Sequence, residues 1–318
     1  MTNKIIYSLL VAGGLLSSCT FDEVDDVNLN VKIDMETQEI YAGDEVRFHI
    51  DGNPDYIVFY SGEPGHIYAN RERCKADVES MVLSYTIKQQ YTETYYQNSE
   101  VMGVWVSEDF NGDYAPESVK KATWTKLSGT GEGMLKVPTC PNIRQETVSE
   151  EADFSVYKDK KFYLALSYQT PLVEGAEKGQ PRVDVKPFKL DKIIDGGLST
   201  MEIPSTDFGF NYVALNGNAS GNFNADESML LFQPGNAFTK EFDIWAISQL
   251  IDPSAVSPDK GEPIKALDMG TDSYVYTYKT PGEYTATFEA RNANMWNSDV
   301  TVKEVKVIVK ERVQDNED

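Results

Sequence analysis

Short segments in which apolar and polar residues alternate with a period of two constrain this 318-residue chain most. Successive side chains of a β-strand point to opposite faces, so this alternation is typical of strands with one buried face. Residues 27–33 (VNLNVKI), 45–50 and 300–310 show it most plainly. Turn-forming segments rich in Gly, Pro, Asn and Asp separate such runs, and helical patterns are scarce. The sequence therefore predicts an all-β fold.

The strand candidates fall into three groups, which occupy residues 27–80, 81–250 and 251–312. Short strands separated by turns are typical of β-sandwiches. The first and third groups either form separate domains or complete one sandwich together, and the sequence leaves both arrangements open.

The second group contains the most strand-like segment of the chain, residues 160–168 (KKFYLALSY), whose large residues on both faces indicate a central strand. Pro187 indicates an edge or a bulge in a later strand, because proline donates no ladder hydrogen bond. Residues 129–159 are expected to be mainly polar connections. Residues 195–226, which include NGNASGNFNAD, are expected to be loop-rich.

The first 26 residues follow a different pattern. Lys4 precedes an apolar run from Ile5 to Leu16, which is too short for a stable transmembrane helix and is typical of a secretion signal. Residues 20–26 (TFDEVDD) then place four carboxylates close together, as in a solvated tether. We expect a signal peptide over residues 1–18 and an acidic tether over 19–26.

Residues 16–19 (LSSC) resemble the bacterial lipobox, which implies that Cys19 is acylated and becomes the mature N-terminus. The alternative is an ordinary secretion signal with an incidental cysteine. The acidic run behind Cys19 resembles the surface-export signal of Bacteroidetes lipoproteins. That resemblance implies a lipid-anchored protein of the outer membrane that faces the cell exterior, and the alternative is a plain tether.

Net charge limits the classes of partner, and the remaining cysteines raise the question of a disulfide. The formal net charge is −22, and no basic patch offsets it, so nucleic acid and other anionic polymers are excluded as partners. Cys74 and Cys140 would lie in an oxidising compartment after export, where a disulfide can persist. The sequence leaves open a Cys74–Cys140 disulfide or two free thiols.

Several segments resemble known sandwich families. Residues 276–290 (YTYKTPGEYTATFEA) resemble the end of polycystic-kidney-disease (PKD) type immunoglobulin-like domains, and residues 42–48 and 59–68 resemble the front half of such a domain. Residues 104–113 and 122–128 resemble Bacteroidetes surface jelly rolls. These resemblances imply PKD/Ig-like β-sandwich modules flanking a jelly-roll-like β-sandwich. The arrangement resembles uncharacterised lipoproteins encoded beside starch-utilisation-type (SusC/SusD-like) importers.

One loop suggests a metal site. Asp109, Asn111 and Asp113 offer side-chain oxygens at alternate positions, a spacing that can surround Ca²⁺. The same residues equally form a stable hairpin turn around Gly112. Both interpretations predict an ordered loop, and only the first predicts a cofactor.

Aromatic residues in polar surroundings suggest a ligand-binding surface. Tyr91, Tyr95 and Tyr96 lie among Gln, Thr and Glu, and Trp296 lies between asparagines. Aromatic faces can stack on sugar rings or peptide side chains while neighbouring amides supply hydrogen bonds. The alternative is that each ring covers its own sheet edge. The other three tryptophans lie in apolar alternations and are expected in the core: Trp105, Trp124 and Trp245.

Catalysis has little support in the sequence. His49 and His66 are the only histidines, and no nucleophile–base pair, phosphate loop or metal-ligand cluster is visible. We therefore expect a non-catalytic accessory of a SusC/SusD-like importer that binds a glycan or peptide. The alternatives are a glycosidase on a jelly-roll scaffold and a structural or adhesive surface protein. A glycosidase would require two buried carboxylates in one cleft, about 5 to 9.5 Å apart.

Overall fold

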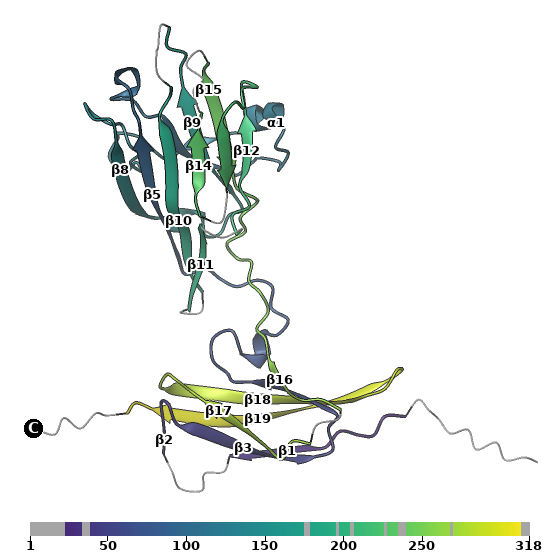
Figure 1. Ribbon diagram of the computed structural model, residues 1–318. Coiled ribbons are helices and arrows are strands. Elements are labelled where there is room, and N and C mark those ends of the chain that lie inside the picture. Colours follow the sequence, from purple (N-terminus) through teal and green to yellow (C-terminus); the bar gives the residue numbers. More distant parts are fainter. Residues whose placement is uncertain are drawn as a thin grey trace, which may run out of the picture. The chain divides into compact units, whose positions relative to one another are not determined.

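The computed structural model describes residues 23–33, 39–174, 179–194, 197–203, 207–225, 228–234, 240–267 and 270–312. Regular structure in these residues is almost entirely β-strand, which confirms the predicted all-β fold (Figure 1). Cys19, with the expected signal and most of the expected tether, lies outside the described residues. Within the described part of the chain, no helix is long and apolar enough to cross a membrane.

The chain forms two compact units. Unit 1 combines the residues up to Arg73 with those from Pro258 onward, and unit 2 comprises Cys74–Ser257. The first and last strand groups therefore belong to one unit. Both junctions lie about seven residues away from the sequence boundaries at 80 and 251, so unit 2 is longer at each end than the predicted middle domain.

Unit 1 consists of two sheets. One sheet holds, in order, β1 (Leu29–Ile33), β3 (Glu45–Gly52) and β17 (Ser273–Thr277). The other holds β16 (Glu262–Lys265), β4 (Tyr56–Tyr60), β18 (Gly282–Ala293), β19 (Ser298–Lys310) and β2 (Ile40–Tyr41). A short 3-10 helix, η1 (Tyr68–Asn70), follows β4.

Aromatic residues from both chain ends build the core of unit 1. The rings of Phe48, Phe59 and Phe288 lie 5.0–5.6 Å apart between centroids, and all three side chains are buried. The buried Tyr278 hydroxyl donates a hydrogen bond of 2.9 Å to the Ser61 carbonyl, 217 residues away in sequence. Burial of three Phe side chains contributes several kcal/mol. Neither end of the chain can complete this core alone.

Unit 2 is a sandwich of two antiparallel sheets. The first sheet holds β13 (Asn222–Ala225), β14 (Leu230–Gln233), β10 (Arg182–Ile194), β5 (Ser80–Gln90) and β8 (Glu146–Asp153), with β11 (Gly197–Ile203) also paired to β10. The second holds β12 (Asn211–Ala214), β15 (Phe242–Ile247), β9 (Tyr163–Thr170), β6 (Met102–Ser107) and β7 (Thr125–Lys126). The helical segments are α1 (Pro116–Lys121), η2 (Thr94–Tyr96) and η3 (Ser155–Tyr157).

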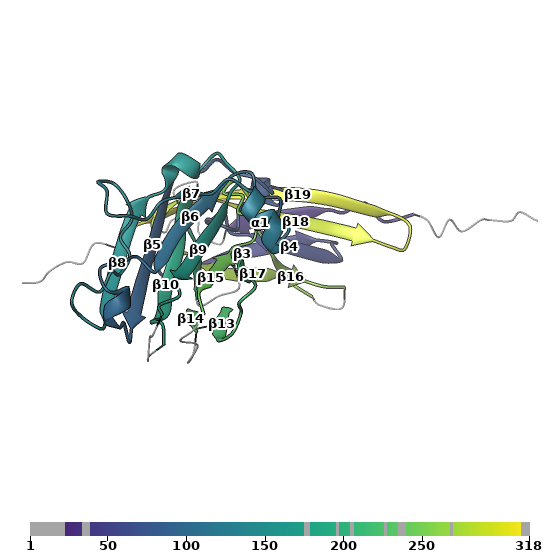
Figure 2. The same cartoon turned by 90° about the horizontal axis from the view of Figure 1, so that it is seen from above.

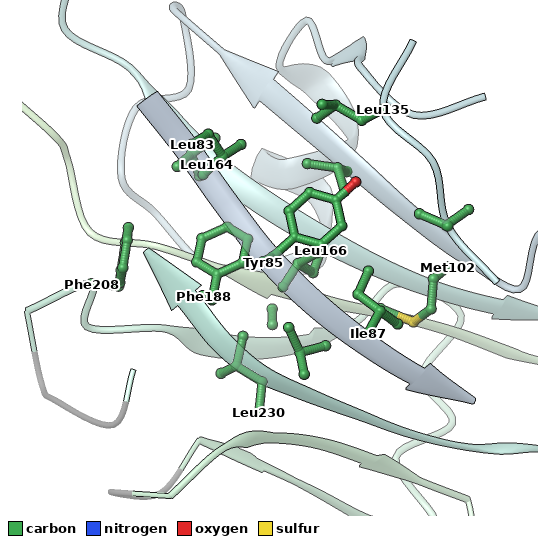
Figure 3. Packing of buried hydrophobic residues seen from close by; sticks show 14 of the residues in the cluster. Leu83, Tyr85, Ile87, Met102, Leu135, Leu164, Leu166, Phe188, Phe208 and Leu230 are labelled. Carbon is green, nitrogen blue, oxygen red and sulfur yellow. The ribbon is translucent and has the colours of Figure 1, made fainter. Parts of the chain in front are cut away.

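The inner faces of these two sheets form the main core of unit 2 (Figure 3). Strand β5 alternates strictly, so that Leu83, Tyr85 and Ile87 point inward while their neighbours are only half-buried. They meet apolar residues of β9 and β10, such as Leu166 and Phe188. The period of two in the sequence thus corresponds to one buried face.

A second, smaller cluster covers the outer face of the β9 sheet. Val119 of α1 and Phe110 of the preceding loop pack against Tyr163, Ile247 and Trp245. Seen from above, α1 lies on the side of this sheet away from β5 and β10 (Figure 2). Strand β9 is therefore covered on both faces and is the middle strand of its sheet, which confirms the expected central strand.

Three expectations about local structure were wrong. The stretch expected to be loop-rich, residues 195–226, contains β11, β12 and β13. The expected polar connection contains β8, an edge strand whose outer residues are acidic or hydroxylated. The sequence analysis also placed no helix at α1. The four strands form because pairing with their neighbours stabilises segments with little apolar periodicity of their own. Helix α1 is held by Val119, which packs into the cluster on the outer face of the β9 sheet.

Proline marks two irregularities. At Pro187 the register between β10 and β5 shifts between Val185 and Phe188, so the alternative of a bulge holds and that of an edge does not. Pro281 separates β17 from β18, and these two strands pair with different sheets, β17 with β3 and β18 with β4 and β19. The Pro-Gly segment thus carries the chain from one sheet of unit 1 to the other.

Candidate functional site

An open, polar hollow lies at one end of the second sheet of unit 2. It measures about 260 Å³ and is lined by residues that end β9 and begin β15, together with the residues that follow β12. A second hollow of about 540 Å³ shares Asn216 and Glu241 with it. We call the two together the end groove. Its lining residues are Gln169, Thr170, Pro171, Leu172, Asn216, Gly217, Asn218, Lys240, Glu241, Phe242 and Asp243.

Cross-strand contacts position the carboxylate side of the end groove. Gln169 and Asp243 are directly paired neighbours on β9 and β15. Oδ1 of Asp243 accepts hydrogen bonds from the Gln169 amide at 3.0 Å and from the Trp245 indole at 2.9 Å. The indole lies one row deeper in the sheet, next to the Trp105 ring at 5.1 Å between centroids. The packed tryptophan rings beneath the rim thus fix the orientation of the Asp243 carboxylate.

The Trp105 indole belongs to the same face of the sheet. Its Nε1 donates a hydrogen bond of 2.8 Å to Ser167 Oγ. Gly103 makes room for it, since a Cβ at this position would lie 2.5 Å from Nε1 and 2.7 Å from Ser167 Oγ. Trp245 is buried, and Trp105 and Trp124 are half-buried against the same cluster. The three tryptophans expected in the core therefore pack together beneath the polar rim, where Trp245 contacts both Trp105 and Trp124.

Amides form the other side of the end groove. The Nδ2 atoms of Asn216 and Asn218 both donate to the main-chain oxygen of Glu241, at 3.1 and 2.7 Å. Lys240 reaches back to Ser220 Oγ at 3.1 Å. These contacts hold the loop after β12 against the start of β15. The Oδ1 atoms also accept hydrogen bonds within the loop, Asn216 from the Asn218 N–H at 3.0 Å and Asn218 from the Ser220 N–H at 3.3 Å. The second N–H of each side-chain amide is the donor that a ligand could use.

Polar groups continue into the interior below the groove. Thr170 lines the groove but is 2% exposed, and its hydroxyl makes no hydrogen bond of ordinary geometry to a described group, although it lies close enough to Tyr168 to lower that phenol's pKa. Burial dominates and raises the pKa of Tyr168, whose hydroxyl donates to the Pro181 carbonyl at 2.7 Å. The buried Gln180 amide donates to the Lys240 carbonyl at 2.7 Å. Thr170 Oγ1 and Gln180 Oε1 are buried polar atoms without a hydrogen-bond partner among the described groups, and such atoms call for an explanation.

Two of the tyrosines predicted to bind a ligand lie at the same end of the sandwich. Tyr91 directly follows β5 and Tyr95 lies in η2, and they are 64% and 45% exposed. Tyr91 has a left-handed φ of +58°, which is strained for a bulky residue and is more frequent at functional positions. The chain enters and leaves unit 2 at the opposite end, where Lys75 bridges to Ala255.

Tyr96 was predicted to lie on the ligand-binding surface, and this prediction was wrong. It is 1% exposed and belongs to the main core of unit 2. Burial raises the pKa of its phenol, and the neighbouring Gln180 amide opposes part of this effect. Because η2 turns the chain between Tyr95 and Tyr96, one ring faces solvent and the other packs inward.

Trp296 is exposed as predicted, but it belongs to unit 1, at the turn between β18 and β19. It is therefore not part of the end groove.

The Asp109–Asp113 loop is an ordered turn. Asp109 Oδ1 accepts from the main-chain N–H of Thr123 at 2.8 Å, and Asn111 Oδ1 accepts from Asp113 at 3.0 Å. Asp113 in turn binds the Ser118 hydroxyl at 2.6 Å, at the start of α1. These hydrogen bonds lower the pKa of both carboxyl groups. Among the described residues, no group of three or more His, Cys, Asp and Glu side chains could hold a metal ion.

Both described cysteines are free thiols, so the disulfide alternative is wrong. Cys74 is exposed where the chain enters unit 2, whereas Cys140 is buried and accepts a hydrogen bond of 3.2 Å from Thr92. Burial raises the pKa of the Cys140 thiol.

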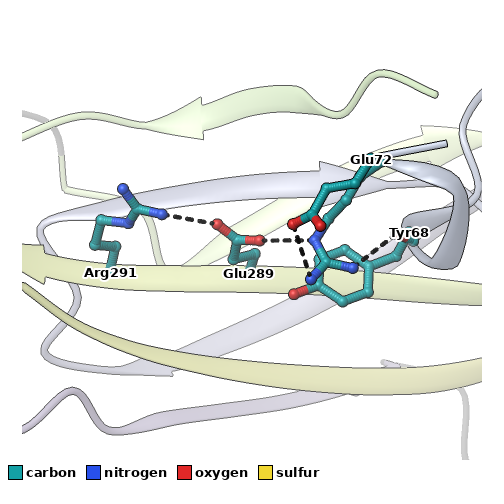
Figure 4. Close-up of polar contacts among 5 residues, drawn as sticks. Tyr68, Glu72, Glu289 and Arg291 are labelled. Atoms are coloured by element: carbon teal, nitrogen blue, oxygen red, sulfur yellow. Dashed lines mark hydrogen bonds and ion pairs between the residues drawn. The ribbon is translucent and has the colours of Figure 1, made fainter. Parts of the chain in front are cut away.

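Two other polar features have partners that explain them. A network in unit 1 joins Arg71 to Glu72, Glu289 and the Tyr68 carbonyl, and the Arg71 guanidinium lies 4.0 Å from the centre of the Tyr68 ring (Figure 4). It fixes the segment after β4 on the sheet.

The second feature is another hollow of about 260 Å³ in unit 2, lined by Glu100 and Glu146 among others. Glu100 pairs with Lys126 at 2.8 Å. Glu146 accepts two main-chain N–H groups at 2.7 Å, so both carboxylates of this hollow have partners within the fold.

The described part of the chain contains one buried carboxylate, Asp259. It accepts from the Ile67 N–H at 2.9 Å and faces Arg73 at 3.7 Å, both in unit 1. The facing pair of buried carboxylates that a glycosidase requires is therefore not found among these residues.

Sequence reasoning missed the end groove. Its three segments are about 25 to 45 residues apart along the chain and meet only through strand pairing. The one available signal was the amide-rich run around Asn216 and Asn218, which is typical of a loop but carries no mark of a binding site. The sequence pointed to exposed aromatic residues as the binding surface. In the structure, the tryptophans nearest the groove lie beneath its rim.

Fold and site together define an all-β protein of two units, the second of which carries an open groove lined by amides and carboxylates. Residues 18–209 match the family model described as a domain of unknown function (DUF5017). Because the match covers more than half of the chain, the protein belongs to this family. None of the curated proteins and none of the solved structures matches the chain significantly.

Proposed function

We propose that the protein is an outer-membrane lipoprotein, anchored through Cys19 and facing the cell exterior, whose end groove binds a neutral glycan without cleaving it. It would act as an accessory of a SusC/SusD-like importer and pass captured ligand to the transporter. The observation that carries the binding proposal is the end groove, an open hollow with amide and carboxylate side chains around its rim. The lipobox-like LSSC segment supports the anchor.

The chemistry of the groove favours a polyhydroxyl ligand. A sugar hydroxyl both donates and accepts. The Gln169 amide can do both, and the Asn216 and Asn218 amides can each donate a second N–H, since their Oδ1 atoms accept hydrogen bonds within the loop. The carboxylates of Glu241 and Asp243 accept hydrogen bonds from hydroxyls but repel anions. Together with the net charge of −22, this argues for a neutral rather than an anionic glycan. A peptide is the alternative ligand, bound through its main-chain amides.

The open shape favours capture over catalysis. Enzymes that cleave glycosidic bonds hold the bond between two carboxyl groups, one of them with a raised pKa. Glu241 and Asp243 line the groove, but Glu241 is exposed and Asp243 is oriented by two hydrogen bonds. Neither side chain is buried, so the groove does not hold the pair of buried carboxylates that such an enzyme requires.

A binding assay with site variants tests the proposal. We expect the mature chain to retain neutral oligosaccharides from a glycan panel and to release no shortened products. Replacing Gln169→Ala and Asn216→Ala together should weaken binding at least about tenfold, because two hydrogen bonds are lost at about 1 kcal/mol each. Gln249→Ala is the matched control, an exposed amide just after the other end of β15.

Two outcomes would overturn the binding proposal. Unchanged affinity in the double variant would move the site elsewhere, and cleavage of the oligosaccharide would make the protein an enzyme. The importer partnership is tested separately by isolating the native protein from outer membranes and identifying what accompanies it. Isolation without any importer component would support the structural alternative.

A further inference from the structure

The turn between β18 and β19 presents two exposed apolar side chains. Met295 is 85% and Trp296 is 60% exposed. Asn294 Oδ1 accepts the main-chain N–H groups of Trp296 and Asn297, at 2.9 and 2.8 Å, and the Asn294 N–H donates to the Asn297 carbonyl at 3.0 Å. These bonds fix the turn, so both side chains are held in solvent at a defined place. We call Met295 and Trp296 the hairpin tip.

The N-terminal segment of the described chain lies against this same hairpin. Asn294 Nδ2 donates to the Glu23 carbonyl at 3.3 Å, and Asn292 Nδ2 donates to the Asp25 carbonyl at 3.0 Å. Asparagine side chains of the hairpin thus bind main-chain oxygens of the acidic segment. The chain that comes from Cys19 therefore meets unit 1 directly beside the hairpin tip.

Covalent reach sets how far the tip can be from the anchor. Three residues lie between Cys19 and Glu23, and the four Cα–Cα steps can span at most about 14 Å. If Cys19 carries acyl chains, as the proposed function holds, the hairpin tip lies within this reach of the bilayer surface. The inference rests on that part of the proposed function.

The surface next to the hairpin tip also exposes aromatic and apolar side chains. Tyr56, Arg291 and Val300 are aligned neighbours on β4, β18 and β19, and all three are exposed. Tryptophan and tyrosine concentrate at the interface between bilayer and water, because each combines an apolar ring with a polar group. An arginine with a long apolar stem suits the same layer.

We infer that the hairpin tip inserts Met295 and Trp296 into the interfacial layer of the bilayer that holds Cys19. The tip is then a second attachment point, which orients unit 1 on the membrane. Carboxylates beside it, including Glu23, Asp25 and Asp299, disfavour an anionic surface. The partner is therefore a lipid surface of low negative charge.

The test replaces the acyl anchor with a chemical tether. The mature chain, residues 19–318 with Cys19→Ser, carries an N-terminal histidine tag and is bound to phosphatidylcholine vesicles that contain a nickel-chelating lipid. The substitution and the tag change none of the described residues, which begin at Glu23. With brominated phosphatidylcholine, we expect quenching and a blue shift of tryptophan emission. Both effects should be lost in Trp296→Phe and reduced when half of the lipid is phosphatidylglycerol.

Two readouts separate the possible failures. Equal quenching in wild type and Trp296→Phe, or none in either while the protein remains on the vesicles, would overturn the inference. Absence of acyl chains on Cys19 in protein isolated from its own membranes would overturn the anchor instead. In the acylated protein, Met295→Ser with Trp296→Ser should lower vesicle retention, and Val156→Ser, which removes a 70% exposed apolar side chain from unit 2, should not.

Discussion

At the scale of single residues, Gly103 makes a steric requirement beneath the polar rim, because its missing side chain leaves the space that the Trp105 indole fills. Gly103→Ala would push a methyl group against Nε1 of that indole and against Ser167 Oγ. We expect a loss of about 1–3 kcal/mol in the free energy of unfolding, measured in urea. Gly270→Ala is the control, since a Cβ there meets no atom within 4 Å. Equal stability of both variants would contradict the assigned packing.

The two thiols should differ in reactivity. Cys74 is exposed, whereas Cys140 is buried with a raised pKa, so less of it is the reactive thiolate at a given pH. In the chain with Cys19→Ser, a thiol reagent should modify one cysteine in the native protein and two after denaturation without reductant. Modification of none after denaturation would show a disulfide.

At the scale of elements, the turn before α1 decides between the two interpretations of its Asp and Asn residues. Hydrogen bonds to Asp109 and Asp113 lower their pKa values, and such groups stabilise the fold above their unfolded pKa and lose this contribution as the pH falls through the lowered folded pKa. The turn should therefore hold without metal. We expect the same melting temperature at pH 7 in a calcium chelator and in millimolar Ca²⁺. A calcium-dependent rise that Asp109→Asn abolishes would restore the calcium hypothesis.

Elements with their own periodicity were predictable, and elements that depend on a partner were not. Strands β3 and β5 alternate in a pattern that fixes which face is buried, and β9 carries large apolar residues on both faces, so the sequence alone predicts all three. Strand β8 has no comparable apolar face and becomes a strand by pairing with β5 over eight residues. Strands β12 and β13 are four residues each, too short for a periodic signal.

At the scale of the whole molecule, unit 2 is inserted into unit 1, and each unit has its own hydrophobic core. We expect the fragment 74–257 to fold alone, with a single cooperative transition in thermal unfolding. A chain that ends at residue 257 should lose the core of unit 1, because it lacks Phe288 and Tyr278. A fragment 74–257 that stays unfolded would contradict this division.

The location of the binding site was also beyond the sequence, for a reason of topology. Gln169, Asn216 and Asp243 come from β9, the loop after β12, and β15, and only the pairing order of these strands brings them together. The sequence did direct attention to Tyr91 and Tyr95, which lie at the same end of unit 2. Turn direction within η2 decided that Tyr96 points the other way.

Hydrogen–deuterium exchange of the mature chain, with and without a neutral oligosaccharide that it retains, tests the central claim most directly. The proposed function predicts slower exchange in residues 169–172, 216–218 and 240–243, and unchanged exchange at the turn between β18 and β19. Protection confined to other segments of unit 2, or to unit 1, would contradict the assignment of the end groove as the glycan site.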